Sequence, residues 1–399
     1  MIRHCRTCLM SSSRPRVVFD ETGQCNACKW HFGGKLGIDW KEREREFHEI
    51  IKEHKRHNVY DCVVPFSGGK DSSVICHRLR HEFGLRPLAV CYGQLLWTDV
   101  GRRNFHRVAE SGIDILYWRV DQVVSRNLAR RFFIERGHPK QHYDAAVNAV
   151  PLITAINFNI PLVIYAEHGE TEYGGLVLDE ESRRTRNIAE VLEHQVGDDP
   201  RNWAADGITE KDLYPYCYPD LESVGRVGVK AFYFSHFFPW DIYENAKYAR
   251  EKLGFETARD GLPSRSLGEG WWGRSDGSFE GFDSIDDMID DLDYYMMYIK
   301  FGFGRATRMA SRLIQNGHMT REQGLELVRR YDGEFPRRYL SGICEYLGMT
   351  EAEIRDVADK HRNEEIWRRE STGTGDISDM QMGELHGLEE RWVLRHPPS

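Results

Sequence analysis

A six-residue loop near residue 70 constrains the fold of this chain more than any other feature. The loop follows a short apolar run, Cys62–Phe66, and precedes a segment with the apolar spacing of a helix. Glycines let a backbone turn tightly and bring its amides close to an anion, and the N-terminus of a following helix adds partial positive charge. The pattern therefore predicts a strand, a phosphate-binding loop and a helix. The loop reads Ser67-Gly68-Gly69-Lys70-Asp71-Ser72.

This loop differs from the two commonest glycine-rich nucleotide motifs. It has neither the G-x-x-x-x-G-K-[ST] spacing nor the G-x-G-x-x-G spacing. The serine hydroxyls can add hydrogen bonds to a phosphate, and Lys70 either neutralises phosphate charge or points to solvent. A bare carboxylate beside a phosphate would repel it, so we expect Asp71 to orient the loop or to hold Mg²⁺. We predict Lys70, Asp71 and Ser72 as the catalytic members of the loop.

Strand-like and helix-like segments alternate after the loop, which predicts an α/β fold with a doubly wound parallel sheet. Ligands of such sheets bind beyond the carboxyl ends of the strands, where Ser67, Gly93 and Glu167 lie. The predicted strands are Cys62–Phe66, Pro87–Tyr92, Ile113–Trp118, Pro161–Ala166 and Val229–Phe238. In the first predicted helix among them, Ile75, Leu79 and Phe83 form one apolar face. The others are Arg102–Glu110, Val123–Arg136 and Ala145–Asn157, the last with a kink at Pro151.

The remaining segments suggest three parts. Residues 1–40 read as a zinc ribbon, residues 41–245 as the α/β domain with a charged linker helix from Trp40 to Lys55, and residues 246–399 as a mainly helical region for substrate or partner. Within the last part, residues 261–282 read as a long loop rich in glycine and tryptophan, and loops of that length are often functional. Residues 285–360 read as helices, and a polar tail begins at Arg362.

Four of the nine cysteines form two C-x-x-C pairs near the N-terminus. About 16 residues separate the pairs, a spacing typical of a four-cysteine zinc site. Four thiolates complete the tetrahedral shell of zinc and leave no open position, so a structural zinc ion is predicted. Reduced thiols without a metal are the alternative. The predicted ligands are Cys5, Cys8, Cys25 and Cys28.

Composition limits the classes of partner. A chain of 399 residues with a net charge of −9 is a poor candidate for holding nucleic acid by bulk charge. No apolar stretch reaches the roughly 20 residues of a membrane span, and no apolar region of a signal peptide follows the first basic residues. We therefore expect a cytoplasmic enzyme without a membrane span.

Two further clusters carry candidate binding residues. After the fourth predicted strand, Glu167, Glu170 and Tyr173 lie in a segment rich in carboxylates, which suits Mg²⁺ or a substrate nitrogen. An acidic loop in solvent is the alternative. Lys300 and Arg305 flank two glycines, which suits a phosphate or a carboxylate. The alternative there is a glycine-kinked helix with surface charges.

The loop Ser67–Ser72 resembles the SGGxDS loop of the PP-loop ATP pyrophosphatases, which have a HUP-like fold and split ATP between the α and β phosphates. Together with the cysteine pairs, Tyr173-Gly174-Gly175, Phe238-Pro239-Trp240-Asp241 and Tyr298–Arg305, it makes the chain similar to the N-acetyl sugar amidotransferases of bacterial surface-glycan synthesis. The resemblance runs from Cys5 to about Asp359. One departure is Ala166, where such proteins usually have glycine before the glutamate.

The resemblance implies an ATP-dependent amidotransferase in lipopolysaccharide O-antigen or flagellar glycan synthesis. It would convert an N-acetyl group of a nucleotide-linked sugar into an acetamidino group through an O-adenylyl intermediate, with ATP and Mg²⁺ bound and zinc structural. The six loop residues would hold ATP and the leaving pyrophosphate. No glutaminase signature occurs in the chain, so ammonia would come from separate glutaminase and ammonia-channelling subunits resembling imidazole glycerol phosphate synthase.

Two other functions fit parts of the pattern. A tRNA thiolase of the same superfamily also combines cysteine pairs with this loop, but the five remaining cysteines form no further C-x-x-C. A non-catalytic zinc-ribbon assembly module that only binds nucleotide is the second alternative. Products formed from ATP, ammonium and acetamido sugars would separate the three.

Overall fold

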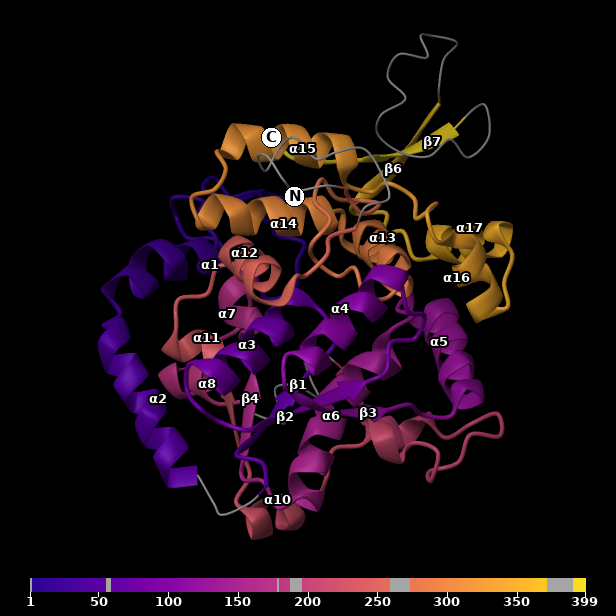
Figure 1. The fold of residues 1–399 in the computed structure, drawn as a ribbon. Coiled ribbons are helices and arrows are strands. Elements are labelled where there is room, and N and C mark those ends of the chain that lie inside the picture. The colour runs from indigo at the N-terminus through magenta and orange to yellow at the C-terminus, as the bar shows by residue number, and fades with distance from the viewer. Residues whose placement is uncertain (1, 55–58, 178, 187–195, 259–272, 372–389) are drawn as a thin grey trace.

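A five-stranded parallel sheet organises the molecule (Figure 1). The computed structural model describes residues 2–54, 59–177, 179–186, 196–258, 273–371 and 390–399. The strand order is β3-β2-β1-β4-β5, so the chain moves outward in one direction from β1 to β3 and in the other from β4 to β5. The order therefore reverses between β1 and β4, which is where sheets of this type bind their ligands.

The strands follow the predicted apolar runs closely. They are β1 (Cys62–Pro65), β2 (Pro87–Tyr92), β3 (Asp114–Trp118), β4 (Leu162–Tyr165) and β5 (Lys230–Tyr233). A two-stranded antiparallel sheet, β6 (Trp367–Ser371) with β7 (Glu390–Leu394), lies in the tail that was predicted only as polar.

Helices account for most of the other described residues. Those of the α/β region are α2 (Trp40–His54), α3 (Lys70–His81), α4 (Asp99–Glu110), α5 (Gln122–Arg136), α6 (Gln141–Asn157), α7 (Gly169–Tyr173), α8 (Glu180–Arg184), α10 (Leu221–Val227), α11 (Phe234–Phe237) and α12 (Ile242–Leu253). The N-terminal region carries α1 (Asn26–Lys29), and the C-terminal region carries α13 (Ile289–Phe301), α14 (Arg305–Gln315), α15 (Arg321–Tyr331), α16 (Leu340–Leu347) and α17 (Glu351–Lys360). Single 3₁₀ or π turns occur at Trp30–Gly34, Lys35–Gly37, Pro200–Trp203 and Tyr214–Tyr216.

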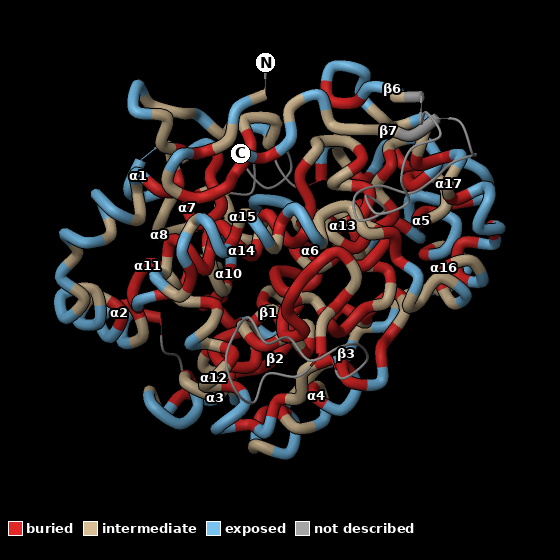
Figure 2. The backbone as a smooth tube through the Cα atoms, turned by 90° about the horizontal axis from the view of Figure 1, so that it is seen from above, coloured by how far each residue is buried: buried red, intermediate tan, exposed pale blue. Residues whose placement is uncertain are grey.

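Alternate residues of β1 point into two different cores. Val63 lies in the core shared with α5 and α6, whereas Cys62 and Val64 lie in the core shared with α2 and α3. Side chains alternate across a strand, so both faces of the sheet are covered by helices. In Figure 2 β1 and β2 lie in the buried interior, and α2 at the periphery is largely exposed.

One expectation about local structure needs correction. The predicted strand Val229–Phe238 splits into β5 and the short helix α11. The helical turn lets Phe234, Phe237 and Phe238 all reach the ring of Phe47, which an extended strand with alternating faces could not do. Pro151 lies inside α6, at the position where a kink was predicted. Of the predicted loop 261–282, residues 261–272 lie outside the described part of the chain.

The N-terminal cysteine region packs on the C-terminal helices. All four paired cysteines share a hydrophobic core with residues of α14, among them Met309 and Leu313. Leu9 donates its backbone amide to Ser311 Oγ over 3.3 Å. In Figure 1, α14 and α15 accordingly lie next to the N-terminal region and above the edge of the sheet. None of the described helices is both long and apolar enough to cross a lipid bilayer.

Candidate functional site

The Ser67–Ser72 loop joins the carboxyl end of β1 to the N-terminus of α3. Gly68 has φ +92°, in the left-handed region that favours glycine. Ser67 Oγ accepts the backbone amide of Gly69 at 3.0 Å, and Ser73 Oγ donates to the Gly69 carbonyl at 2.7 Å. The loop is therefore a tight, internally bonded turn that directs a helix N-terminus at the edge of the sheet, an arrangement suited to an anion.

Lys70 is enclosed at this edge, with only 2% of its surface exposed. Its Nζ lies 2.7 Å from Asp71 Oδ2 and 2.5 Å from Asp283 Oδ1. Burial alone would lower the pKa of Lys70, but Asp283 and Asp71 outweigh it and raise the pKa well above its usual value. The second oxygen of Asp71 accepts a 2.9 Å hydrogen bond from Asn245 of α12. Lys70 is thus a fixed positive charge.

Arg308 of α14 lies on the other side of Asp283. Its Nη1 is 2.8 Å from Asp283 Oδ2 and donates to the Tyr294 hydroxyl at 2.6 Å. Its Nη2 donates to the Tyr173 hydroxyl at 3.0 Å. One carboxylate, that of Asp283, is therefore shared by two cations, Lys70 and Arg308.

Glu167 completes the group from the end of β4. The Tyr173 hydroxyl donates to Glu167 Oε1 at 3.5 Å. Burial and the nearby carboxylate of Asp71 raise the pKa of Glu167 to about 7, although Lys70 and Arg308 act in the opposite direction. Carboxylates from two adjacent strand ends thus face one site, and one of them changes charge near neutral pH.

Residues from the end of β2 and from the segment before α13 also border the site. Gln94 Nε2 donates to the Ser67 carbonyl at 2.9 Å and to Asp286 Oδ2 at 2.5 Å. Burial raises the pKa of Asp286 to about 6. The chain at Asp286 passes so close to α4 that a Cβ on Gly101 would lie 2.6 Å from Asp286 Cα. The C-terminal region therefore packs directly against the loop.

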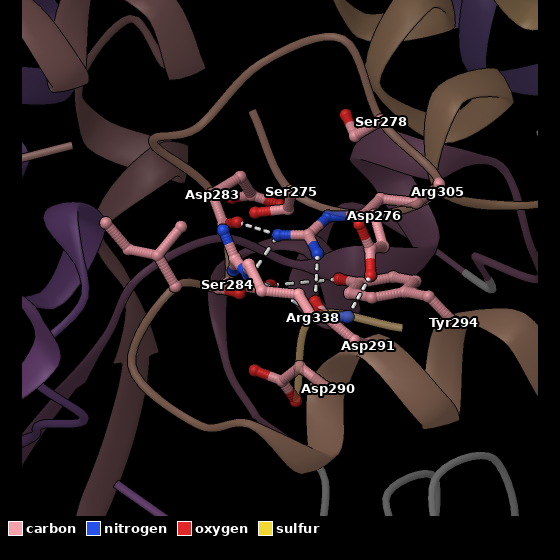
Figure 3. Close-up of polar contacts among 12 residues, drawn as sticks. Ser275, Asp276, Ser278, Asp283, Ser284, Asp290, Asp291, Tyr294, Arg305 and Arg338 are labelled. Atoms are coloured by element: carbon pink, nitrogen blue, oxygen red, sulfur yellow. Dashed lines mark hydrogen bonds and ion pairs between the residues drawn. The ribbon is translucent and has the colours of Figure 1, made fainter. Parts of the chain in front are cut away.

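Arg305, predicted to hold an anion, is 2% exposed and surrounded by protein groups (Figure 3). Its guanidinium pairs with Asp291 at 3.0 Å, donates to the carbonyls of Asp283 and Ser284, and lies over the Tyr294 ring at 5.0 Å. Ser284 has φ +48°, which is rare for a serine. Its Nη1 and Nη2 are both bonded to protein groups, and through the two carbonyls Arg305 fixes the backbone that carries Asp283.

Two other predicted residues also contact protein groups. Lys300 Nζ donates to the carbonyl of Arg136 at 2.8 Å. Glu170 pairs with Arg16 of the cysteine region at 3.1 Å, rather than facing the loop. Of the residues predicted outside the loop, Glu167 and Tyr173 are the ones that the structure brings to it.

Several residues at the site carry no local sequence signal. Each comes from a segment distant from the loop in the chain, so only the fold brings them together. For Arg308 the closest sequence indication was its neighbour Arg305, which was predicted as a binding residue and lies three residues earlier on the same helix. These residues are Gln94, Asn245, Asp283, Asp286, Tyr294 and Arg308.

The four N-terminal cysteines are buried, and their sulfurs lie within 4.8 Å of one another. Cys5 and Cys28 Sγ are 3.9 Å apart, and Cys8 and Cys25 Sγ are 3.8 Å apart. Four sulfurs about 2.3 Å from one tetrahedral zinc ion lie about 3.8 Å apart, so the cluster could bind a structural zinc ion. Gln315 of α14 donates to Cys28 Sγ at 3.4 Å, which ties the cluster to the C-terminal helices.

The fold and site thus define an α/β protein with a parallel sheet, a glycine-rich loop at its switch point and a cysteine cluster able to hold a metal. Residues 276–381, about a quarter of the chain, match the family model of the LPS biosynthesis protein WbpG-like, C-terminal domain. No curated protein matches the chain. The matched region includes Asp283, Asp286 and Arg308, which border the loop. The match supports a role in lipopolysaccharide biosynthesis, as an enzyme.

Proposed function

We propose that this chain is an ATP-dependent amidotransferase that converts the acetamido group of a nucleotide-linked sugar into an acetamidino group. The observation that carries the proposal is the contact between two parts of the chain. The Ser67–Ser72 loop, whose sequence resembles that of an ATP-pyrophosphatase loop, meets the region matched to a lipopolysaccharide-biosynthesis family through the Lys70–Asp283 ion pair.

The reaction needs a leaving group on the acetamido carbon, because an amide oxygen leaves poorly. The amide oxygen attacks the α-phosphorus of ATP, and the bond to the β-phosphate oxygen breaks, which releases pyrophosphate. Ammonia then adds to the activated carbon, AMP leaves with the former amide oxygen, and the nitrogen adduct loses a proton. The loop amides, the start of α3 and Lys70 stabilise the negative charge that grows on pyrophosphate.

Glu167 suits the proton transfer of the second step. A group with a pKa of about 7 exists in both protonation states at neutral pH, which is what an acid–base catalyst needs. Its carboxylate lies beyond β4, across the switch point from the loop, so a sugar amide between the two would face it. We assign Glu167 as the residue that takes the proton from the incoming nitrogen.

Asp71 suits a magnesium ion that arrives with ATP. Mg²⁺ commonly takes one or two protein carboxylates together with phosphates and water. The side chain of Asp71 is 21% exposed beside the loop, and within the described ranges the cysteine cluster is the one group of three or more metal-ligand side chains found close together. When bound, Mg²⁺ would supply charge neutralisation for the phosphates. Zinc in the cysteine cluster would be structural.

The proposal includes the setting of the reaction. We place it in the cytoplasm, where ATP and nucleotide-linked sugars are available, with ammonia from a separate glutaminase and an ammonia-channelling subunit. In an assay with the chain alone, a high concentration of ammonium replaces both subunits.

The experiment is incubation with ATP, Mg²⁺, ammonium and a panel of nucleotide-linked acetamido sugars, followed by mass spectrometry. We expect one sugar to become about one mass unit lighter, because NH replaces oxygen, with AMP and pyrophosphate as the other products. Lys70→Ala should abolish the conversion, and Glu222→Gln on the exposed face of α10 should not change it. Sugar-dependent ADP, or a tRNA product about 16 units heavier through sulfur, would refute the proposal.

A further inference from the structure

Arg308 is more exposed than the two arginines that flank it on α14, Arg305 and Arg312. Arg305 and Arg312 are each 2% exposed, and each is closed by a buried carboxylate, Asp291 and Glu172 respectively. The Arg308 side chain is 20% exposed. The outer two arginines therefore fasten α14 to its neighbours, and Arg308 between them is partly exposed and is joined to Lys70 of the loop through the shared Asp283 carboxylate.

The ion pairs at the loop share one anion between two cations. Asp283 Oδ1 bonds to Lys70 and Asp283 Oδ2 to Arg308, and the carboxylate is 10% exposed in its side chain. Lys70 and Asp71 make the remaining pair, so these four groups sum to zero net charge. A polyphosphate entering the loop would meet the Asp283 carboxylate between the two cations that it needs.

The backbone beneath Asp283 is fixed, which leaves the side chain as the part that can change partners. Arg305 holds the carbonyls of Asp283 and Ser284, as described above. Rotation of the Asp283 carboxylate would free the contact of Lys70 Nζ and the contact of Arg308 Nη1 together, while Asp71 keeps Lys70 in place and the Tyr294 and Tyr173 hydroxyls keep Arg308 in place. Arginine is well suited to such a site because its donors match the oxygens of a phosphate in pairs.

We propose that Arg308 is a second phosphate-binding residue, and that Asp283 is a built-in counter-ion that the β and γ phosphates of the nucleotide replace. The inference rests on the proposed function for the identity of the nucleotide, but it concerns pyrophosphate recognition alone. The helix matched to the lipopolysaccharide-biosynthesis family thereby contributes a ligand to the loop of the α/β domain.

Calorimetric titration with inorganic pyrophosphate and, separately, with AMP tests this assignment. Arg308→Gln should weaken pyrophosphate binding about tenfold or more, the size expected for a lost charged hydrogen bond, and leave AMP binding unchanged. Arg308→Lys, which keeps the charge and loses the paired donors, should fall between. Arg330→Gln on the exposed face of α15 is the matched control and should bind as wild type does.

For Asp283→Asn we expect pyrophosphate affinity to rise rather than fall. The variant removes the competing charge and should bind pyrophosphate several-fold more tightly. Circular dichroism confirms that each variant is folded. Unchanged binding by both Arg308 variants, or weaker binding by Asp283→Asn, would overturn the inference. Arg308-dependent pyrophosphate binding without AMP formation from any sugar would refute the proposed function while the inference stands.

Discussion

Arg305 shows how burial decides the role of a single residue. Its charge is enclosed with that of Asp291, with 1% of each side chain exposed. Without Arg305, the buried Asp291 carboxylate would keep only the longer contact with Arg338 Nε at 3.8 Å, and breaking a buried pair of this kind costs about 3–5 kcal/mol. We therefore expect Arg305→Ala to lower the free energy of unfolding by that amount in denaturant titrations, whereas the exposed Arg330→Ala should change it little. Equal stability of both variants would contradict this role.

Glu167 makes stability depend on pH. Burial and Asp71 raise its pKa from 4.5 to about 7, so the folded protein holds this proton when the unfolded chain has lost it. Between these two values the unfolded state binds fewer protons, and stability therefore falls as pH rises. Glu167→Gln cannot ionise and should be more stable than wild type at pH 8, by up to about 3 kcal/mol, with a smaller gain at pH 5.

Denaturant unfolding of both proteins from pH 5 to pH 8 measures the difference. The exposed Glu222→Gln serves as the control and should follow wild type throughout. A difference between Glu167→Gln and wild type that does not grow with pH would show that the carboxyl ionises at its ordinary pKa.

Among the elements, the approach of α4 to the segment before α13 sets one wall of the site. A methyl group at Gly101 would lie 2.6 Å from Asp286 Cα and 2.9 Å from its carbonyl oxygen, so the backbone must shift. We expect Gly101→Ala to cost about 1–3 kcal/mol of stability and to weaken pyrophosphate binding, because Asp286 is bonded to Gln94 at the loop. Gly225→Ala in α10 meets open space and should be neutral or slightly stabilising in the same assays.

A second coupling between elements runs from the cysteine cluster to the end of β4. Arg16 pairs with Glu170, and Asn26 donates to the Gly175 carbonyl at 2.7 Å. Metal analysis should find one zinc per chain in wild type and none in Cys5→Ser/Cys25→Ser. Hydrogen exchange should then be faster in residues 169–175 as well as in the cysteine region. Cys217→Ser/Cys344→Ser, outside the cluster, should retain zinc, and a zinc-bearing cluster variant would refute the ligand assignment.

The elements also show why sequence predicted some features and missed others. Apolar runs bounded by turn residues predicted β1 to β4 within one residue at each end. In β1, β2 and β4 the reason is burial on both faces of the sheet, which requires a continuous apolar run in the sequence. The apolar run Val229–Phe238 did not predict where β5 ends. Its phenylalanines pack into one aromatic cluster with Phe47, and they do so from a helical turn rather than from a strand. The loop and Glu167 were predictable from strand ends. Arg308 and Asp283 were not, because their positions depend on packing between distant segments.

At the scale of the whole molecule, the N-terminal region is part of a shared core. Leu9 packs near Gly324 and Ile314, and Ser13 donates to the Phe301 carbonyl at 2.5 Å. A chain that begins at residue 41 would expose this apolar surface of α14 and α15. We expect it to aggregate in size-exclusion chromatography, whereas the full chain should elute as a sharp peak. A folded, monodisperse shortened chain would show that the first 40 residues are dispensable for folding.

The cysteines differ in burial, so the number of thiols that react with an alkylating reagent should depend on the folding and metal-binding state of the chain. Burial raises the pKa of Cys62, Cys76 and Cys91, so these thiols should resist alkylation while the fold persists. Cys217 and Cys344 are partly exposed and should react in the intact protein. The four cluster cysteines are buried as well, so they should react only when removal of the metal loosens the cysteine region, which would bring the reactive thiols to six, and complete unfolding should release all nine. The number of labels in a mass spectrum would then distinguish the metal-bound, metal-free and unfolded forms without any activity measurement.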